Sequence, residues 1–322
     1  MKTIRLGSIA LVCLCLCLSV ASADDWLRFR GPGGSGVSIE SKRLPTEWSP
    51  TANVGFKTAL PGAGVSSPIV VGTRVFVTCY SGYGLQRESP GDINDLKRHL
   101  VCIDGNSGAV IWQQDVAAAL PEDPYTGIGV TGHGYASHTP VSDGSRVYVF
   151  YGKSGVYAYD FDGNQLWHTD VGKESDPLKW GSSSSPILHN DVLIVTASAE
   201  SQAIVGLDKN TGNQVWRQEA KGLDGMWGTP ILVDVANGGV DLVMIVANEI
   251  WGLNPDTGKL RWWCSTFDAE HAYSSAVSHD ATIYAVTSGG GGSIAVSAGG
   301  KGDVTKTNVK WVGRDTVRFG SP

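Results

Sequence analysis

The sequence predicts an all-β protein, a β-propeller built from four-stranded blades. Three observations predict it: a short Pro-containing step that recurs along the chain, a turn that always precedes a tryptophan by the same distance, and the composition. Of 322 residues, 42 are Gly, and only 17% are charged. This mixture is typical of many short strands joined by tight turns, because helices require more Ala, Leu, Glu and Lys.

The first repeat is a Ser/Thr-Pro-apolar step. Successive marker positions lie 72, 46, 44, 46 and 46 residues apart, and only the first interval, which contains two insertions, is out of step. A period of this length is typical of propeller blades. The markers are Pro68, Pro140, Pro186, Pro230, Ala276 (where Ala replaces Pro) and Pro322.

The second repeat is an Asp/Asn-containing turn that ends in Gly, with Trp four residues later. Asp, Asn and Gly are the residues that a tight hairpin turn requires. Apolar and β-branched runs fill the space between the two repeats, so each unit has four strands, A to D. Complete units are expected at 65–116, 136–171, 181–219, 226–266 and 273–312.

The two ends of the repeat array are irregular. Val54–Thr58 resembles an isolated strand D before the first unit, and a sixth strand A would begin at Ser321-Pro322. In closed propellers, a strand from one end of the chain often completes the blade at the other end and removes exposed sheet edges. We therefore expect this propeller to be C-terminally incomplete.

The N-terminus resembles a targeting segment. Lys2 and Arg5 precede an apolar stretch of 12 residues, Ile9–Val20, and Ala21-Ser22-Ala23 is a small-x-small cleavage site. A membrane anchor is the alternative, but a span needs roughly 20 residues. We predict a signal peptide at 1–23, with cleavage after Ala23 and a periplasmic or extracellular location. An N-terminal extension at 24–52 and the propeller at 53–322 follow.

Charge and cysteine content limit the partners and the redox chemistry. The net charge is −6 and no basic run occurs, so no nucleic-acid partner is expected. No later apolar run is long enough to span a membrane. The mature chain keeps Cys79, Cys102 and Cys264. Cys79 and Cys102 lie on predicted neighbouring strands, where they form either a disulfide or two buried thiols.

The Asp-x-x-Thr/Ser-Gly turn with its following Trp resembles the tryptophan-docking repeat of quinoprotein dehydrogenases and of the non-catalytic BamB-like propellers. The opening Trp26–Pro32 is similar to the start of secreted bacterial PQQ-binding-like β-propeller repeat proteins. The resemblance implies closure with seven or eight blades. It indicates little about activity, because the fold hosts many functions.

Alternating strands place the B–C and D–A loops on one face of the propeller. The insertions at 81–99 and 117–135 are therefore expected side by side on this face, where binding usually resides. Residues leading into strand A from the second unit onward add histidines and aromatics around the central channel. They could stack a planar ligand, or they could plug the channel and wedge between blades. The candidates are His133, Tyr135, Trp180, Trp227, His271 and Tyr273.

Other conspicuous residues are interpreted as structural. The turn aspartates are expected to form local hydrogen bonds, and the strand-D tryptophans to pack between blades. The cluster Asp92, Asn94 and Asp95 lacks the full ligand run of a Ca²⁺ loop and is interpreted as a solvated loop. Glu200 and Glu249 lie at B–C turns with no evident partner. The structural tryptophans are Trp112, Trp167, Trp216, Trp262 and Trp311.

No catalytic residue, cofactor or metal site is predicted. Catalytic-triad, metalloprotease and P-loop motifs do not occur. Quinone enzymes of the resembled fold hold their cofactor with Ca²⁺ and often carry two adjacent cysteines, which this sequence lacks. The sequence therefore favours a non-enzymatic binding or assembly scaffold for a protein, peptide or glycan. A quinoprotein-like oxidoreductase dependent on pyrroloquinoline quinone (PQQ) and Ca²⁺ is the alternative.

Overall fold

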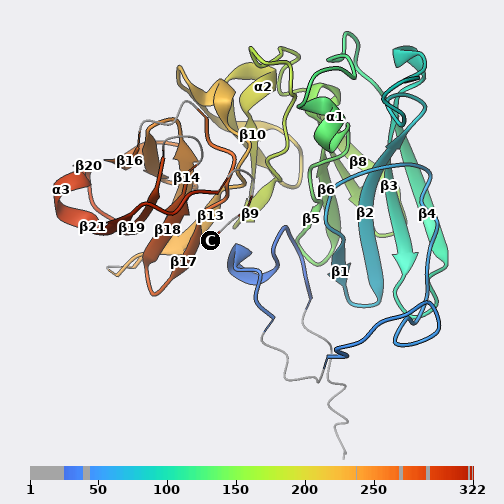
Figure 1. Cartoon of the computed structure of the whole chain (residues 1–322), viewed down its shortest axis with the longest axis horizontal. Helices are drawn as coiled ribbons and strands as arrows, with labels where there is room; N and C mark the ends of the chain where they lie inside the picture. The colour runs from blue at the N-terminus through green and yellow to red at the C-terminus, as the bar shows by residue number, and fades with distance from the viewer. Residues whose placement is uncertain are drawn as a thin grey trace, which may run out of the picture.

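The fold is a β-propeller arc of five blades (Figure 1). The computed structural model describes residues 25–38, 44–236, 238–267, 271–287, 291–317, 320 and 322, so the predicted signal peptide lies outside the described residues. Each blade is an antiparallel sheet whose strands follow the chain from A to D. The predicted repeat units therefore correspond to the observed sheets.

The strands of the first three blades are as follows. Blade 1 contains β1 (Ile69–Val71), β2 (Arg74–Ser81), β3 (Lys97–Asp104) and β4 (Val110–Ala117); blade 2 contains β5 (Val141–Ser142), β6 (Arg146–Phe150), β7 (Val156–Asp160) and β8 (Gln165–Thr169); blade 3 contains β9 (Ile187–His189), β10 (Val192–Ala197), β11 (Ala203–Asp208) and β12 (Gln214–Glu219).

Blade 4 contains β13 (Ile231–Asp234), β14 (Val240–Val246), β15 (Glu249–Leu253) and β16 (Leu260–Ser265); blade 5 contains β17 (Val277–His279), β18 (Thr282–Val286), β19 (Ser293–Ser297) and β21 (Val309–Gly313). Between β19 and β21, a connection with β20 (Gly302–Asp303) and α3 (Thr305–Asn308) reaches back, and β20 pairs in parallel with β16 of blade 4.

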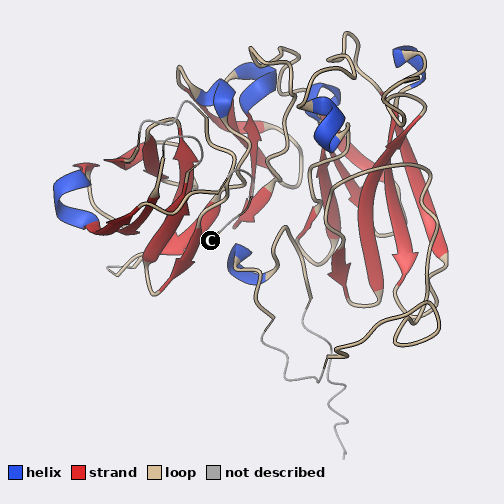
Figure 2. Cartoon of the chain, in the orientation of Figure 1, coloured by secondary structure: helices blue, strands red, loops and turns tan. Residues whose placement is uncertain are grey.

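The helices are single turns within loops. One face of the arc, the upper face in Figure 2, carries η2 (Ile93–Asp95), α1 (Val130–His133), η3 (Gly152–Ser154), α2 (Ser198–Ser201) and η4 (Leu223–Gly225). We call it the loop face. In the described part of the chain, no helix has the length and apolar character needed to cross a bilayer.

The two insertions meet on the loop face, as their positions in the repeat predict. The Tyr125 amide donates to the Tyr83 hydroxyl at 3.0 Å, and the Ala118 amide donates to the Leu96 carbonyl at 3.1 Å. Asp92 accepts from the Asn94 amide and caps η2, which matches its interpretation as a loop residue.

The tryptophan of strand D links each blade to the next one. Trp112 Nε1 donates to the carbonyl of Phe161, Trp167 Nε1 to that of Lys209, and Trp216 Nε1 to that of Pro255, at 2.8, 3.0 and 3.1 Å. Each acceptor lies in the C–D turn of the following blade. The turn glycine lies under the ring: a Cβ built on Gly163, Gly212 or Gly258 would lie 2.9, 2.7 or 2.3 Å from the tryptophan.

Strand C supplies a small residue opposite every tryptophan. The five pairs are Cys102–Trp112, Ala158–Trp167, Gly206–Trp216, Gly252–Trp262 and Ala295–Trp311, and in each blade the strand register shifts just after the small residue. A Cβ on Gly206 would lie 2.3 Å from the Trp216 ring. The large ring is therefore accommodated by a missing or minimal side chain on its neighbour.

The segment before blade 1 uses Phe56 in place of a tryptophan. A Cβ on Gly108 would lie 2.5 Å from the Phe56 ring, and Thr58 Oγ1 donates to the Gly108 carbonyl at 2.6 Å. Two residues after Trp167, Thr169 Oγ1 makes the same bond to the Gly212 carbonyl at 2.7 Å. Residues 53–60 form no strand, contrary to the expected strand D, yet they reproduce its docking contacts.

A second link between blades lies at the inner strands. The backbone amide of each marker Ser or Thr donates to the hydroxyl of the marker residue one blade later. The pairs are Ser67 to Thr139, Thr139 to Ser185, Ser185 to Thr229 and Thr229 to Ser275, at 2.9–3.0 Å. Within this series, the Ser/Thr of a repeat therefore donates with its backbone amide to one neighbouring blade and accepts with its hydroxyl from the other.

Two tryptophans differ from the regular docking. Trp262 is fully buried, but Nε1 donates to Asp241 in its own blade at 2.7 Å, since blade 5 replaces the standard turn with the β20–α3 connection. Trp311 is 46% exposed and contacts Tyr284 of its own blade. The expectation that it packs between blades does not hold, because no sheet covers β21 in the described residues.

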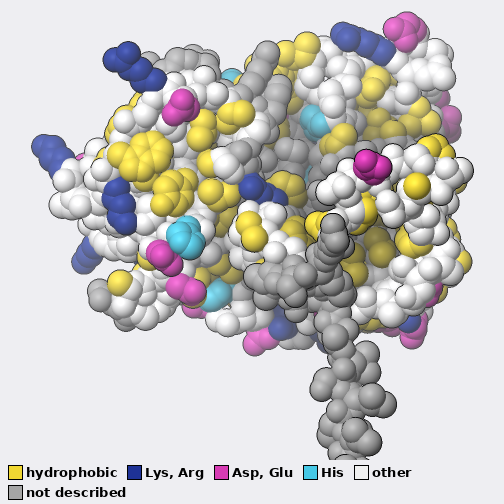
Figure 3. Space-filling model, turned by 60° about the horizontal axis from the view of Figure 1, so that its bottom comes forward, with side chains coloured by type: hydrophobic (Ala, Val, Ile, Leu, Met, Phe, Trp, Pro, Cys, Tyr) yellow, Lys and Arg dark blue, Asp and Glu magenta, His cyan; other side chains and the backbone are white. Residues whose placement is uncertain are grey.

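The N-terminal segment crosses the face opposite the loop face. Trp26 pairs with Val70 of blade 1, the Leu27 carbonyl accepts from Ser142 of blade 2, and Arg28 Nη2 donates to the Pro230 carbonyl of blade 4. In Figure 1, η1 (Pro32–Gly34) lies below the centre of the arc. Figure 3 shows this side of the molecule, where basic side chains lie singly and mostly near the rim.

The three cysteines of the described residues are free thiols, and all are buried. Cys79 and Cys102 lie on paired strands, but Cys79 is opposite His99 and Cys102 is opposite Phe76. Of the two alternatives, the structure therefore has the buried thiols.

The packing of Trp216 predicts a strong effect of Gly206→Ala. The added methyl group would overlap the ring, and overpacking typically costs about 1–3 kcal/mol. Chemical denaturation should therefore give a lower free energy of unfolding for this variant. The control is Gly132→Ala, where a Cβ meets nothing within 4 Å. Equal stability of the two variants would contradict the inferred contact.

Candidate functional site

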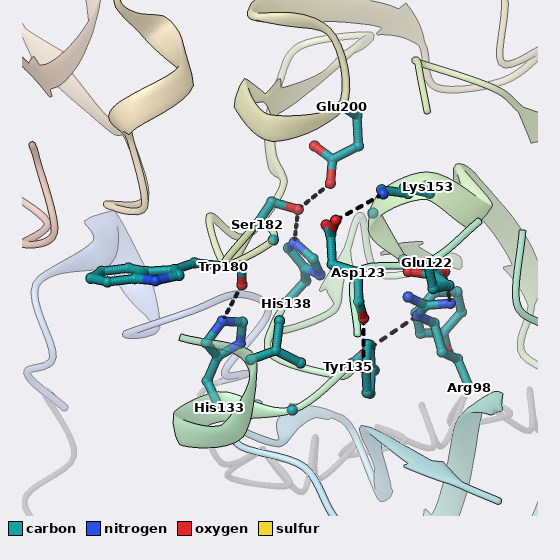
Figure 4. Close-up of a pocket in the computed structure, with 15 residues that line it drawn as sticks. Arg98, Glu122, Asp123, His133, Tyr135, His138, Lys153, Trp180, Ser182 and Glu200 are labelled. Carbon is teal, nitrogen blue, oxygen red and sulfur yellow. Dashed lines mark hydrogen bonds and ion pairs between the residues drawn. The ribbon is translucent and has the colours of Figure 1, made fainter. Parts of the chain in front are cut away.

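A small pocket opens on the loop face between the loops of blades 1, 2 and 3 (Figure 4). Its free volume is about 30 Å³, enough for one water-sized group. Charged and polar side chains with little solvent exposure form most of its walls. They come from β3, the 117–135 insertion, η3, α2 and the segment that leads into β9.

Arg98 on β3 forms the first group. Its Nη1 lies 2.7 Å from Glu122 Oε1, and both side chains are 4% exposed. Nε donates to the Tyr135 carbonyl at 3.0 Å, and Nη1 also donates to the Ser154 hydroxyl at 3.1 Å. The guanidinium is therefore committed to neutralising Glu122 and to holding the insertion against η3.

Lys153 in η3 forms the second group. Its Nζ lies 3.3 Å from Asp123 Oδ1 and donates to the Ser175 hydroxyl at 2.7 Å and the Pro121 carbonyl at 3.1 Å. These contacts match the three hydrogens of an ammonium group. Lys153 and Asp123 are both 6% exposed, so the ion pair is buried. The two opposite charges neutralise each other.

Glu200, His138 and Ser182 form the third group. Ser182 Oγ donates to Glu200 Oε1 at 2.5 Å, and His138 Nε2 lies 3.1 Å from the same hydroxyl. Since the hydroxyl hydrogen points at Glu200, the serine oxygen accepts from a protonated Nε2. Glu200 is 2% exposed and has no ion-pair partner within 4 Å among the described residues.

Burial shifts the pKa values of this third group strongly. Desolvation raises the pKa of Glu200 to about 7 and lowers that of His138 to about 3, with Arg98 adding to the second shift. His138 is therefore neutral at physiological pH, and Glu200 titrates near neutrality.

Four buried polar atoms of the pocket walls lack a hydrogen-bond partner: Glu122 Oε1, Glu200 Oε2, His138 Nδ1 and the Tyr151 hydroxyl. Glu122 Oε1 is ion-paired with Arg98 at 2.7 Å, which leaves the other three neither hydrogen-bonded nor ion-paired. Such atoms are costly to bury, and native structures satisfy most of them with protein, water or ligand. The pocket thus presents unused hydrogen-bonding capacity.

The predicted funnel residues divide into two groups. Four of them form one aromatic cluster beside the pocket: Trp180, Trp227, His271 and Tyr273, with neighbouring ring centroids 5.3–6.0 Å apart. Trp227 is buried and its Nε1 donates to the Gly181 carbonyl at 2.7 Å, while the other three are half-buried.

The other two funnel residues line the pocket, as does Trp180 of the cluster. His133 is held between the Ser137 hydroxyl at 2.6 Å and the Trp180 carbonyl at 2.8 Å, and burial lowers its pKa. Tyr135 is buried among the insertion tyrosines, and its hydroxyl donates to the Asp123 carbonyl at 2.7 Å. The predicted ring of six is therefore a wall of the pocket and an adjacent aromatic cluster.

The arrangement of Ser182, His138 and Glu200 differs from that of a catalytic triad. In a catalytic triad, His lies between Ser and the carboxylate and accepts the serine proton. Here Ser182 lies in the middle and donates to Glu200, so His138 is not placed to activate it. Across the described residues, no three His, Cys, Asp or Glu side chains are grouped as metal ligands. A Ca²⁺ site needs six to eight oxygens, so these residues do not fit the Ca²⁺–PQQ centre of quinoproteins.

The sequence analysis missed Arg98, Glu122, Asp123, His138, Lys153 and Ser182, and found no partner for Glu200. Local composition gave no signal, because ordinary charged loop residues are usually solvated. One signal was available. His138 lies one residue before Thr139 and Ser182 lies three residues before Ser185, the Ser/Thr of the repeat in blades 2 and 3, and B–C turns such as that of Glu200 lie on the same face.

The raised pKa of Glu200 predicts a pH-dependent stability. Its carboxyl holds a proton in the folded state up to about pH 7, whereas in the unfolded chain it ionises near 4.5. The contribution of this group to the free energy of unfolding is fully present below pH 4.5 and is lost as pH rises through 7. At pH 8, Glu200→Gln should be more stable than wild type by on the order of 2–3 kcal/mol, with a smaller gain at pH 5. Denaturation curves at both pH values measure this, and a pH-independent difference would contradict it.

Comparisons with solved structures show what the chain is similar to. BamB from Moraxella catarrhalis is 14% identical, with a TM-score of 0.48, and the match covers 76% of this chain and 59% of that protein. Quinohemoprotein alcohol dehydrogenase from Comamonas testosteroni is 15% identical with a TM-score of 0.53, over 86% of this chain and 47% of that enzyme. The chain thus spans about half the length of these structures, and the likeness to the second one shows a shared fold. No curated protein matches.

A family match carries more weight. The sequence model of the family described as outer membrane protein assembly factor BamB matches residues 96–317, which include four of the five blades and most of the pocket walls. The docking turns, the blade tryptophans and the marker hydroxyls all lie in or beside this range. The chain therefore belongs to the BamB family of PQQ-like β-propeller repeat proteins.

Proposed function

We propose that the protein is a non-catalytic binding or assembly module that acts outside the cytoplasm and recognises a segment of another protein with its loop face. The observation that carries the proposal is the pocket between blades 1, 2 and 3, whose buried acceptor atoms are unused. The family description as an assembly factor favours a protein partner over a glycan.

Exposed apolar side chains on the two insertions support a protein partner. Leu85, on the first insertion, is 49% exposed, and Leu120 and Ile128, on the second, are 48% and 64% exposed. Apolar side chains exposed together on one face are typical of protein interaction sites. The insertions themselves are held by the ion pairs of Arg98 and Lys153, so this surface is pre-organised.

Photo-crosslinking tests this role. A photoreactive residue at Leu85 or Ile128 should give one discrete adduct in cells that produce the protein. The same residue at Leu166 or Val215 serves as the control, since these strand-D positions are 44% and 52% exposed and lie away from the loop face. Mass spectrometry then identifies the partner. Identical adducts from all four positions, or none from Leu85 and Ile128, would refute the proposal.

The quinoprotein-like alternative has a direct test. Because the pocket residues do not provide a Ca²⁺ ligand set, we expect no dye reduction with alcohols or sugars when the purified protein is supplied with PQQ and Ca²⁺. Dye reduction that a chelator abolishes and Ca²⁺ restores would establish the oxidoreductase and falsify the non-catalytic role.

A further inference from the structure

When Glu200 is ionised, the pocket contains one buried negative charge more than it can balance. Three carboxylates line it, Glu122, Asp123 and Glu200, and two cations, Arg98 and Lys153. Arg98 pairs with Glu122 and Lys153 with Asp123, as described above. Glu200 has only the neutral Ser182 as a side-chain partner. A buried charge without a counter-charge is strongly unfavourable, so this site favours an added cation.

The free atoms around this charge are acceptors. With Glu200 ionised, its Oε2 can only accept a hydrogen bond. The direction of the serine bond places the His138 hydrogen on Nε2, so Nδ1 carries a lone pair. The Tyr151 hydroxyl can also accept. His138, Tyr151 and Glu200 are 5%, 1% and 2% exposed, and all three line the same cavity.

A cation that donates hydrogen bonds matches this set. A primary ammonium group carries one positive charge and three N–H donors, equal in number to the three wall atoms that are neither hydrogen-bonded nor ion-paired. A water molecule could occupy the volume of about 30 Å³ and donate twice, but it cannot neutralise Glu200. A guanidinium is larger than the cavity, and K⁺ or Na⁺ would leave the His138 lone pair without a donor.

We propose that this pocket binds a single ammonium group, which donates to Glu200 Oε2, His138 Nδ1 and the Tyr151 hydroxyl. The group is either a free small amine or the side chain of a lysine inserted by a partner protein. Only the second source rests on the proposed function, since the pocket itself would bind an amine with or without a protein partner.

Thermal unfolding of the purified protein at pH 8 tests the pocket. Ammonium and methylammonium chloride should raise the melting temperature in a saturable way, by about 2 °C or more once the site is filled. Potassium and tetramethylammonium chloride at equal ionic strength should not, because neither donates a hydrogen bond. A rise no larger with ammonium than with potassium would overturn the proposal.

Variants assign the effect to the pocket. Glu200→Gln should abolish the ammonium-specific rise, whereas the matched Glu249→Gln, at the equivalent turn of blade 4, should retain it. Tyr151→Phe removes only one acceptor oxygen and leaves the Glu200 charge in place, so it should weaken the response without abolishing it. Persistence of the full rise in both pocket variants would contradict the assignment.

A final comparison separates the two sources. If a partner lysine is the natural ligand, Nα-acetyl-lysine amide should bind more tightly than methylammonium, and Nε-acetylation should abolish binding. If only small amines bind, the pocket is a site for a free cation. If ammonium has no effect but the loop-face crosslinks form, the ammonium site is refuted while the proposed binding role stands.

Discussion

The contact on which the structure depends is the one between neighbouring blades. A four-stranded sheet of this size cannot bury both faces alone, so its stability comes from the sheets beside it. Two devices fix that contact. At the outer edge, a strand-D tryptophan packs on the turn glycine of the next blade and donates to a carbonyl there. At the inner edge, a marker hydroxyl accepts from the amide of the previous blade. Together they fix both the spacing and the tilt of successive sheets.

The contact between blades also fixes the geometry of the loop face. His138 and Ser182 lie a few residues before the marker hydroxyls of blades 2 and 3, so the inner links hold the two side chains at a fixed separation. Glu200 reaches them from the B–C turn of blade 3. The pocket is therefore built at a seam between blades, and its shape does not depend on a single flexible loop.

The sequence predicted the blades because the repeat residues have local, invariant tasks. Gly163, Gly212 and Gly258 must be glycine to admit a ring, and the marker Ser/Thr must carry a hydroxyl, so both recur at the blade period. The pocket could not be predicted in the same way. Whether Arg98 or Lys153 is solvated or buried depends on where the 117–135 insertion folds back, and that contact between distant segments leaves no local pattern. Phe56 is a second case that a local pattern does not predict. It packs on the turn glycine of blade 1, as the strand-D tryptophans do on theirs, although its segment forms no strand.

The buried charges show how rigidity and binding are combined on this face. An ion pair buried as deeply as Lys153–Asp123 gives little net stability over apolar packing, but breaking it leaves an uncompensated charge, so it specifies one arrangement of the insertion. Glu200 lacks such a partner and makes the folded state less stable where it is ionised. A cost of this kind, at a seam where the neighbouring charges are paired, is retained in native proteins mainly where function uses it. The unpaired carboxylate therefore distinguishes the part of the pocket for which we propose ligand binding from the parts that hold the loops.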